Sequence, residues 1–201
     1  MSLNLTEEYW TKRYQDNDAG WDIGYVSPPL KKYVDQLTDK QIKILIPGAG
    51  NSYEAEYLVN NGFENVYVCD LSTEPLNNLL QRCPKIKKEN LVHGDFFELN
   101  KPAAGIAFDL IVEQTFFCAL NPALRKKYFQ KMSELLNPGG HLIGLLFDDT
   151  LNTDRPPFGG NKAEYLAYIG EDFIIRCFER CYNSIGPRQG RELFMNLQKR
   201  V

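Results

Sequence analysis

The fold is decided by one stretch, Ile42-Lys43-Ile44-Leu45-Ile46-Pro47-Gly48-Ala49-Gly50-Asn51-Ser52-Tyr53. Its apolar residues predict a strand buried on both faces, which breaks at Pro47. Gly48 and Gly50 then allow a tight turn into a helix and a close approach of the backbone to a ligand. Because Gly-x-Gly also occurs in ordinary strand-to-helix turns, other segments must agree before this stretch indicates a nucleotide-like cofactor.

Size and composition limit the class of protein. The chain has 201 residues, of which 43% are hydrophobic and 24% charged, and this predicts one α/β domain over residues 1–201. Within it we expect an N-terminal lid and helices over 1–38 and a Rossmann-like core over 42–201. The net charge of −3 and the pI near 5.5 argue against nucleic-acid binding. We expect a monomer that acts on small molecules.

Cellular location and metal binding follow from a few residue types. No apolar run reaches about 18 residues and no charged-then-apolar leader opens the chain, so we expect neither a membrane span nor a secretory signal. Five cysteines without a Cys-x-x-Cys pair fit a reducing compartment, which favours the cytoplasm. His93 and His141 lie far apart beside apolar residues, so we expect no metal site.

Strand and helix signals alternate along the chain. Helices are expected over 7–15, from Pro28, over 53–60, after Ser72, from Asn121 until Pro138-Gly139-Gly140, and after Asn161. Strands are expected over 42–46, 66–70, 90–93, 108–113, 142–147, 173–182 and 191–199. This order predicts a doubly wound, mostly parallel seven-stranded sheet with an antiparallel C-terminal edge hairpin, because no helix separates the last two strands. Residues 148–160, rich in Pro and Gly, are typical of an active-site loop.

The residues that follow the strands carry the candidate site. In a doubly wound sheet the ligand lies beyond the carboxyl ends of the strands, where Gly48, Asp70, Asp95 and Glu113 stand. Asp70, about twenty residues past the glycines, suits hydrogen bonds to ribose hydroxyls. Acids at strand ends also occur as ordinary helix caps. Taken together, these four residues favour a nucleoside cofactor.

The choice of cofactor depends on one position. A dinucleotide site requires a third glycine where Tyr53 stands, so that the helix can hold a pyrophosphate. S-adenosylmethionine has no pyrophosphate, and acids around it complement its sulfonium charge. The sequence therefore favours S-adenosylmethionine. A nicotinamide-dependent oxidoreductase and a non-catalytic cofactor-binding module stay open as alternatives.

Aromatic residues gather near the N-terminus. Trp10 and Tyr14 are four positions apart and share a helix face, which Trp21 joins after a turn. The three form either a small satellite core or a cover for the ligand.

Motifs across nearly the whole chain together resemble a known family. They are Trp10-x3-Tyr14-x6-Trp21-Asp22-x-Gly24, Ile46-Pro47-Gly48-Ala49-Gly50, Asp70-Leu71-Ser72, Gly94-Asp95-Phe96-Phe97, Phe108-Asp109-Leu110-Ile111-Val112-Glu113, Phe116-Phe117-Cys118-Ala119-Leu120, Arg155-Pro156-Pro157-Phe158, and Ser184-Ile185 with Arg188-x-Gly190. In this order they resemble the thiopurine S-methyltransferase family of class I S-adenosylmethionine-dependent methyltransferases, above all its thiol and halide methyltransferase branch.

The resemblance implies a role for each matching residue. Trp10, Tyr14 and Trp21 would close over the cofactor, and Gly48 and Gly50 would face its methionine part. Asp70 would bind the ribose, Asp95 and Phe96 the adenine, and Glu113 would lie near the amino-acid end. The implied reaction is in-line methyl transfer to a small nucleophile, most simply a thiol, with hydrosulfide, halide and thiopurine as further candidates. It leaves S-adenosylhomocysteine and requires no covalent catalytic residue.

The acceptor side is the least transferable part. Asp154-Arg155 replaces the Gly-Gly that commonly precedes the Pro-Pro-aromatic motif. Our hypothesis is that Arg155 favours the thiolate form of the acceptor, while Phe117 and Phe158 form apolar walls. A solvated loop cation is the alternative for Arg155.

Overall fold

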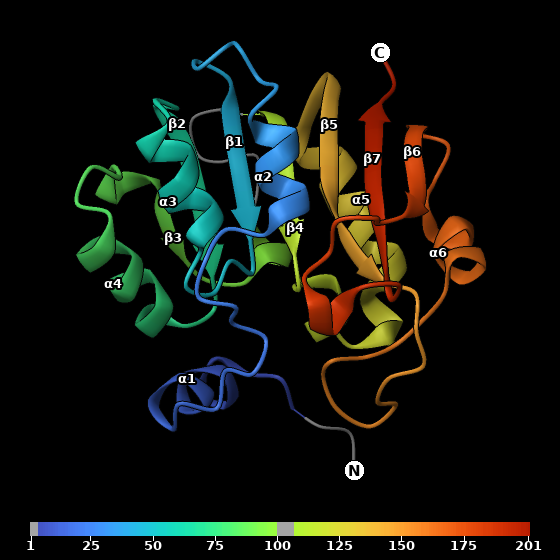
Figure 1. The fold of residues 1–201 in the computed structure, drawn as a ribbon, viewed down its shortest axis with the longest axis horizontal. Helices are drawn as coiled ribbons and strands as arrows, with labels where there is room; N and C mark the ends of the chain where they lie inside the picture. The colour runs from blue at the N-terminus through green and yellow to red at the C-terminus, as the bar shows by residue number, and fades with distance from the viewer. Residues whose placement is uncertain (1–3, 100–106) are drawn as a thin grey trace.

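A seven-stranded sheet forms the centre of the protein (Figure 1). The structure, a computed structural model, describes residues 4–99 and 107–201. The sheet order is β3-β2-β1-β4-β5-β7-β6. The strands are β1 (Lys43–Pro47), β2 (Asn65–Asp70), β3 (Leu91–His93), β4 (Phe108–Gln114), β5 (Leu136–Phe147), β6 (Phe173–Arg180) and β7 (Glu192–Lys199). The first five are parallel and β7 is antiparallel to both β5 and β6, which confirms the predicted fold class and edge hairpin.

Helices cover both faces of the sheet. The helices of the protein are α1 (Glu7–Gln15), α2 (Pro28–Val34), α3 (Tyr53–Asn60), α4 (Thr73–Arg82), α5 (Arg125–Leu135) and α6 (Lys162–Tyr168), of which α2 to α6 lie against the faces. Side chains of α2, α3 and α4 pack in one core with Ile44 and Ile46, whereas α5 and α6 pack on the other face with Leu45. Alternate residues of a strand point to opposite faces, so β1 is buried on both sides, as the apolar stretch predicts.

The order of the strands fixes where a ligand can bind. From β1 the chain continues to β2 and β3 on one side of the sheet, and β4 then returns to the other side of β1. A doubly wound sheet binds its ligand at this reversal, beyond the carboxyl ends of β1 and β4. Figure 1 shows α1 lying beyond the end to which the β1 arrow points. The N-terminal segment is therefore placed at the expected binding edge.

One boundary differs clearly from the sequence prediction. The long helix was expected to continue to Pro138-Gly139-Gly140, but α5 ends at Leu135 and β5 begins at Leu136. Leu136 pairs with Phe108 of β4, and a register shift follows between Phe108 and Leu110. Pairing with β4, which local sequence does not encode, therefore extends the chain before the proline is reached. Among the described residues, no helix is long and apolar enough to cross a membrane.

Gly144 of β5 has no side chain, and the space beside it is filled by Glu113 of β4. A Cβ atom at Gly144 would lie 2.3 Å from Glu113 Cβ and 2.7 Å from Glu113 O. Gly144→Ala should therefore lower the free energy of unfolding by about 1–3 kcal/mol through overpacking. Urea denaturation measures this loss. Gly170→Ala is the matched control, because nothing lies within 4 Å of its added Cβ, and it should change stability by less than about 0.5 kcal/mol. Equal stability of Gly144→Ala and wild type would contradict the prediction.

Candidate functional site

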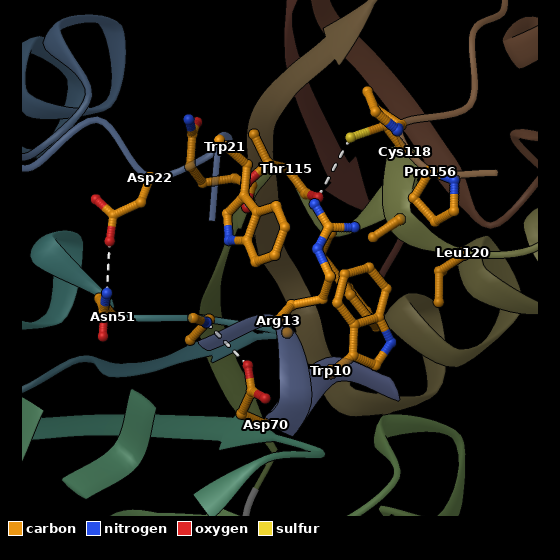
Figure 2. A pocket seen from close by; sticks show the side chains of 18 of the residues that line it. Trp10, Arg13, Trp21, Asp22, Asn51, Asp70, Thr115, Cys118, Leu120 and Pro156 are labelled. Carbon is orange, nitrogen blue, oxygen red and sulfur yellow. Dashed lines mark hydrogen bonds between the residues drawn. The ribbon is translucent and has the colours of Figure 1, made fainter. Parts of the chain in front are cut away.

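A cavity of about 820 Å³ lies at the carboxyl ends of β1, β2 and β4 (Figure 2). We call its lining residues before β4 the near wall. Prominent among them are Trp10, Arg13, Tyr14, Trp21, Asp22, Gly48, Gly50, Ser52, Glu54, Asp70, Asp95 and Phe97. We call the lining residues from the end of β4 onward the far wall. It includes Gln114, Thr115, Cys118, Leu120, Phe147, Leu151, Pro156, Pro157, Pro187, Arg188 and Arg191. The volume is in the range of small-molecule sites.

The glycine turn after β1 is held by the acid after β2. Gly48 and Gly50 both have φ of 54°, a left-handed conformation that favours glycine. The Gly50 amide donates to Asp70 Oδ2 at 2.8 Å, and the Ser72 amide donates to Asp70 Oδ1 at 2.9 Å. Asp70 is only 8% exposed, and burial raises the pKa of its carboxyl group, while these two donors act against the rise. One carboxylate thus links the ends of two neighbouring strands beside the cavity.

The N-terminal aromatic residues form one cluster at the cavity. The Trp10 and Trp21 ring centroids are 5.6 Å apart, and those of Tyr14 and Trp21 are 5.7 Å apart, both edge to face. Figure 2 shows Trp10, Arg13 and Trp21 next to one another, and the Arg13 guanidinium lies 4.9 Å from the Trp21 centroid. Burial, followed by the charge of Asp70, raises the pKa of Tyr14, so its phenol is neutral.

Seven of the nine predicted cofactor residues line this cavity. They are Trp10, Tyr14, Trp21, Gly48, Gly50, Asp70 and Asp95. Phe96 does not: it is 3% exposed and packs against Phe116 and Tyr128. Asp95 Oδ1 accepts from the Phe97 amide at 2.8 Å and caps a 3-10 turn, η2 (Phe96–Glu98). This turn directs Phe96 into the core, and Phe97 lines the cavity instead.

Glu113 also lies outside the cavity lining, because its side chain is enclosed in the interior of the protein. Its side chain is fully buried, and Oε1 accepts from the amides of Phe116 at 2.8 Å and Phe117 at 3.0 Å. The Tyr128 hydroxyl donates to Oε2 at 2.7 Å. Burial raises the pKa of Glu113 to about 7, and these three donors oppose the rise. Glu113 therefore shapes the turn after β4 and acts on the cavity through that turn.

The three predicted acceptor residues are not brought to the cavity. Phe117 and Phe158 are 1% and 6% exposed and lie in the interior. The Phe158 amide donates to the Cys118 carbonyl at 2.7 Å, and Arg125 Nη2 donates to the Gly159 carbonyl at 2.6 Å. These two hydrogen bonds hold the C-terminal end of the loop over residues 148–160 against the interior of the protein. The Arg155 side chain is 64% exposed and its nearest acid is Asp154, so it has the surroundings of a solvated loop cation.

Other residues, which the sequence did not single out for a role, form the far wall. Gln114, Cys118, Arg188 and Arg191 are among them. Arg188 is 8% exposed, and its Nη2 donates to the Trp21 carbonyl at 2.8 Å. The motif Arg188-x-Gly190 marked this region in the sequence, but a contact between residues 167 positions apart has no local signal. Within the described residues, no group of three or more His, Cys, Asp or Glu side chains could hold a metal ion.

Comparison with known proteins decides the family. The sequence model of the thiopurine S-methyltransferase family matches residues 5–199. The chain belongs to this family. Its relatives include a probable thiol methyltransferase 2 of Arabidopsis thaliana, 30% identical over 91% of this chain and 81% of that protein. Thiocyanate methyltransferase 1 of Brassica oleracea is 29% identical over 94% and 83%. A thiopurine S-methyltransferase of Acinetobacter baylyi is 26% identical over 86% and 87%.

Solved structures agree with the fold of the family. The 1,6-didemethyltoxoflavin-N1-methyltransferase of Burkholderia thailandensis, solved with S-adenosylhomocysteine, is 17% identical with a TM-score of 0.78, covering 98% of this chain and 88% of that chain. The N-methyltransferase NodS of Bradyrhizobium japonicum, also solved with S-adenosylhomocysteine, is 16% identical with a TM-score of 0.70, covering 98% and 99%. Both share the class I methyltransferase fold.

This thiopurine S-methyltransferase family member is an S-adenosylmethionine-dependent methyltransferase, and S-adenosylmethionine is its cofactor. The cavity fits that group. Near-wall carboxylates complement its positive charges, and the buried Ser52 Oγ in this wall has no hydrogen-bond partner in the protein. Tyr53 stands where a dinucleotide site needs glycine. The nicotinamide alternative is therefore set aside.

The buried Glu113 generates a pH prediction. Because its pKa is raised from 4.5 to about 7, the folded state binds more protons than the unfolded state between these values. Glu113 therefore contributes fully to the free energy of unfolding below pH 4.5. This contribution falls by roughly 3 kcal/mol as the pH rises through about 7. Glu113→Gln should remove this slope. The urea unfolding midpoints of wild type and Glu113→Gln are measured between pH 4.5 and 8. The difference between the two midpoints at each pH isolates Glu113, because all other acids are present in both proteins. Parallel pH profiles would contradict the prediction.

Proposed function

We propose that the enzyme transfers the methyl group of S-adenosylmethionine to a small sulfur nucleophile that reaches the cavity as an anion. Thiolates, hydrosulfide and thiocyanate form this class, and halides and thiopurines are further candidates. One observation carries the proposal: among the described residues, the far wall contains no Asp, Glu or His. An amine or alcohol acceptor generally needs a group that removes its proton. A thiol, with an ordinary pKa near 8.5, supplies thiolate without one.

The polar groups of the far wall are unsuited to act as a base. Burial raises the pKa of the Cys118 thiol to about 12, so this residue stays protonated. Thr115 Oγ1 donates to the Gln114 carbonyl at 2.7 Å. Arg188 and Arg191 are cations. This wall can bind and orient an acceptor, and its apolar members can exclude water, but it cannot take up a proton at neutral pH.

The near wall would hold the cofactor, whose sulfonium supplies an already activated methyl group. In our proposal Gly48 and Gly50 face its methionine part and Asp70 its ribose. Asp95 and Phe97 face its adenine, with Phe97 in the place first expected for Phe96.

The aromatic residues would close this arrangement. Trp10, Tyr14 and Trp21 would cover the cofactor and exclude water from the reacting atoms. Alignment of an acceptor at about 3–3.5 Å from the methyl carbon can supply about 7–11 kcal/mol of the barrier reduction, so positioning is sufficient as a mechanism. The thiol and thiocyanate methyltransferases among the relatives support the same acceptor class.

We further infer that residues 1–201 work as one unit, as a cytoplasmic monomer that does not act on nucleic acids. All five cysteines are free, which suits a reducing compartment. The net charge of −3 gives no basis for binding a phosphate backbone. The N-terminal segment lines the same cavity as the core, so the two parts share one site.

An acceptor panel tests the proposed function. The enzyme is incubated with radiolabelled S-adenosylmethionine and, separately, with a thiol, hydrosulfide, thiocyanate, iodide, a thiopurine, an amine and a phenol. We expect label in the sulfur compounds and none in the amine or the phenol, because the far wall offers no base. Methylation of the amine or phenol without methylation of any sulfur compound would overturn the proposal. So would binding of S-adenosylhomocysteine without turnover of any acceptor.

Asp70→Ala tests the proposed placement of the cofactor. Loss of charge-assisted hydrogen bonds should weaken S-adenosylhomocysteine binding by about 1.5–3 kcal/mol, or roughly ten- to a hundredfold. Isothermal titration calorimetry measures the dissociation constant. Asp154→Ala is the control, because that side chain is exposed and lies outside the cavity lining. An unchanged dissociation constant for Asp70→Ala would remove this residue from the cofactor site.

A further inference from the structure

Two chain segments of the far wall lie side by side. The turn after β4 contributes Cys118 to the lining, and the loop over residues 148–160 contributes Leu151, Pro156 and Pro157. Figure 2 shows Cys118 and Pro156, one from each segment, on the same side of the cavity. An acceptor that reaches this wall therefore depends on how the two segments are placed relative to each other.

The loop over residues 148–160 is closed at its base. Asp149 and Gly160 each donate their amide to the carbonyl of the other residue, at 3.0 Å in both directions. The base is also closely packed, because a Cβ atom at Gly159 would lie 2.4 Å from the Leu151 nitrogen. A contact that holds this narrow base therefore acts on the cavity-lining residues further along the loop.

One buried cation, Arg125, lies behind the far wall. It is the first residue of α5, is 2% exposed, and does not line the cavity. Its Nη2 donates to the Gly159 carbonyl at 2.6 Å, at the base of the loop. Its Nη1 forms an ion pair of 2.5 Å with Glu164 Oε1 of α6. The two arms of the guanidinium therefore join the loop to α6.

The same guanidinium also contacts the turn after β4. Its carbon lies 5.1 Å from the ring centroid of Phe117, which directly precedes Cys118. A guanidinium over an aromatic ring is attracted by the ring, and the attraction is stronger away from water. The Phe158 amide donates to the Cys118 carbonyl at 2.7 Å and joins the two segments directly. Arg125 therefore contacts both segments, one through a carbonyl and the other through a ring.

A buried arginine is not the most stable way to fill this space. A buried ion pair loses its hydration, and apolar side chains of similar volume are often at least as stabilising. In addition, Arg125 Nε is enclosed without a hydrogen-bond partner in the described part of the chain. An apolar side chain would fill the space, but it could not hold a backbone carbonyl in a fixed place as the planar guanidinium does. The choice of arginine therefore indicates a role in positioning the loop.

We propose that Arg125 is a positioning residue for the methyl acceptor. It holds the turn after β4 and the loop over residues 148–160 at the spacing at which their side chains align the acceptor sulfur with the methyl group. This inference rests on the proposed function and adds a residue that does not touch the reacting atoms. A misplacement of about 1 Å can lower a rate about a hundredfold, so a contact behind the wall is sufficient to affect the reaction.

Hydrogen exchange tests the position of the loop without any turnover. The enzyme is saturated with S-adenosylhomocysteine, and exchange over residues 148–160 is followed by mass spectrometry. The amides of Asp149, Phe158 and Gly160 are hydrogen-bonded in the wild type. We expect Arg125→Met to speed their exchange about tenfold or more, the ratio that follows from the loss of one charge-assisted hydrogen bond. The affinity for S-adenosylhomocysteine should stay at the wild-type value, because Arg125 does not line the cavity.

Steady-state kinetics with two acceptors test the consequence for the reaction. Benzenethiol carries a ring that packs against the far wall, whereas hydrosulfide makes few contacts with it. We expect Arg125→Met to lower kcat/KM for benzenethiol about tenfold more than kcat/KM for hydrosulfide. A general loss of folded enzyme would lower both values to the same extent. Arg125→Lys should restore part of the difference, because it keeps the charge without the planar fork.

Two further variants complete the experiment. Glu164→Gln weakens the same contact from its partly exposed side and should produce the same changes at smaller size. This variant keeps the inference testable if the Arg125 variants fold poorly. Lys162→Met is the matched control, because it removes an exposed ion pair with Glu179 from the same helix. It should exchange and turn over as wild type does.

Several outcomes would overturn the inference. Wild-type exchange over residues 148–160 in Arg125→Met would do so, as would equal losses of kcat/KM for the two acceptors. A parallel loss of S-adenosylhomocysteine affinity would make Arg125 only a support of the fold. The two proposals fail in different ways: if wild type methylates no sulfur compound, the proposed function fails. Turnover by wild type together with an unchanged ratio of the two acceptors in Arg125→Met defeats this inference alone.

Discussion

The buried carboxylate of Glu113 is the constraint on which both walls of the cavity depend. It accepts hydrogen bonds from two successive amides and from the Tyr128 hydroxyl, and so it fixes the turn that follows β4. This turn carries Phe116, whose ring occupies the space that a Cβ atom of Gly48 would need. A fully buried acid is costly unless its oxygens are paired, and here the pairing joins the turn after β4 to α5.

The cavity is lined by both carboxylates and guanidinium groups. The near wall carries Asp22, Glu54, Asp70, Asp95 and the cation Arg13, and the far wall carries Arg188 and Arg191. Methyl transfer from a sulfonium to an anion removes both charges and needs no proton acceptor. A site of this kind works by holding two partners in line and excluding water, so that few of its residues need to react.

Most residues predicted for the cofactor line the cavity, whereas none of the three predicted for the acceptor does. Gly48, Gly50, Asp70 and Asp95 line the cavity because the carboxyl ends of parallel strands meet at one edge of the sheet. The acceptor residues depend on a loop that is held by distant side chains, such as Arg125 at the Gly159 carbonyl. No periodicity marks which residue of such a loop faces inward, and Arg155 accordingly lies outside the lining.

By itself the sequence determined the alternation of strands and helices, the glycine turn and the acid at the end of β2, because apolar periodicity, backbone freedom and capping are local properties. Only the tertiary structure decided that Phe97 rather than Phe96 lines the cavity, that Glu113 is enclosed in the core, and that Arg188 meets the Trp21 carbonyl. These outcomes depend on packing and hydrogen bonds between residues far apart in the chain, and burial and pairing exist only after the sheet has brought those residues together.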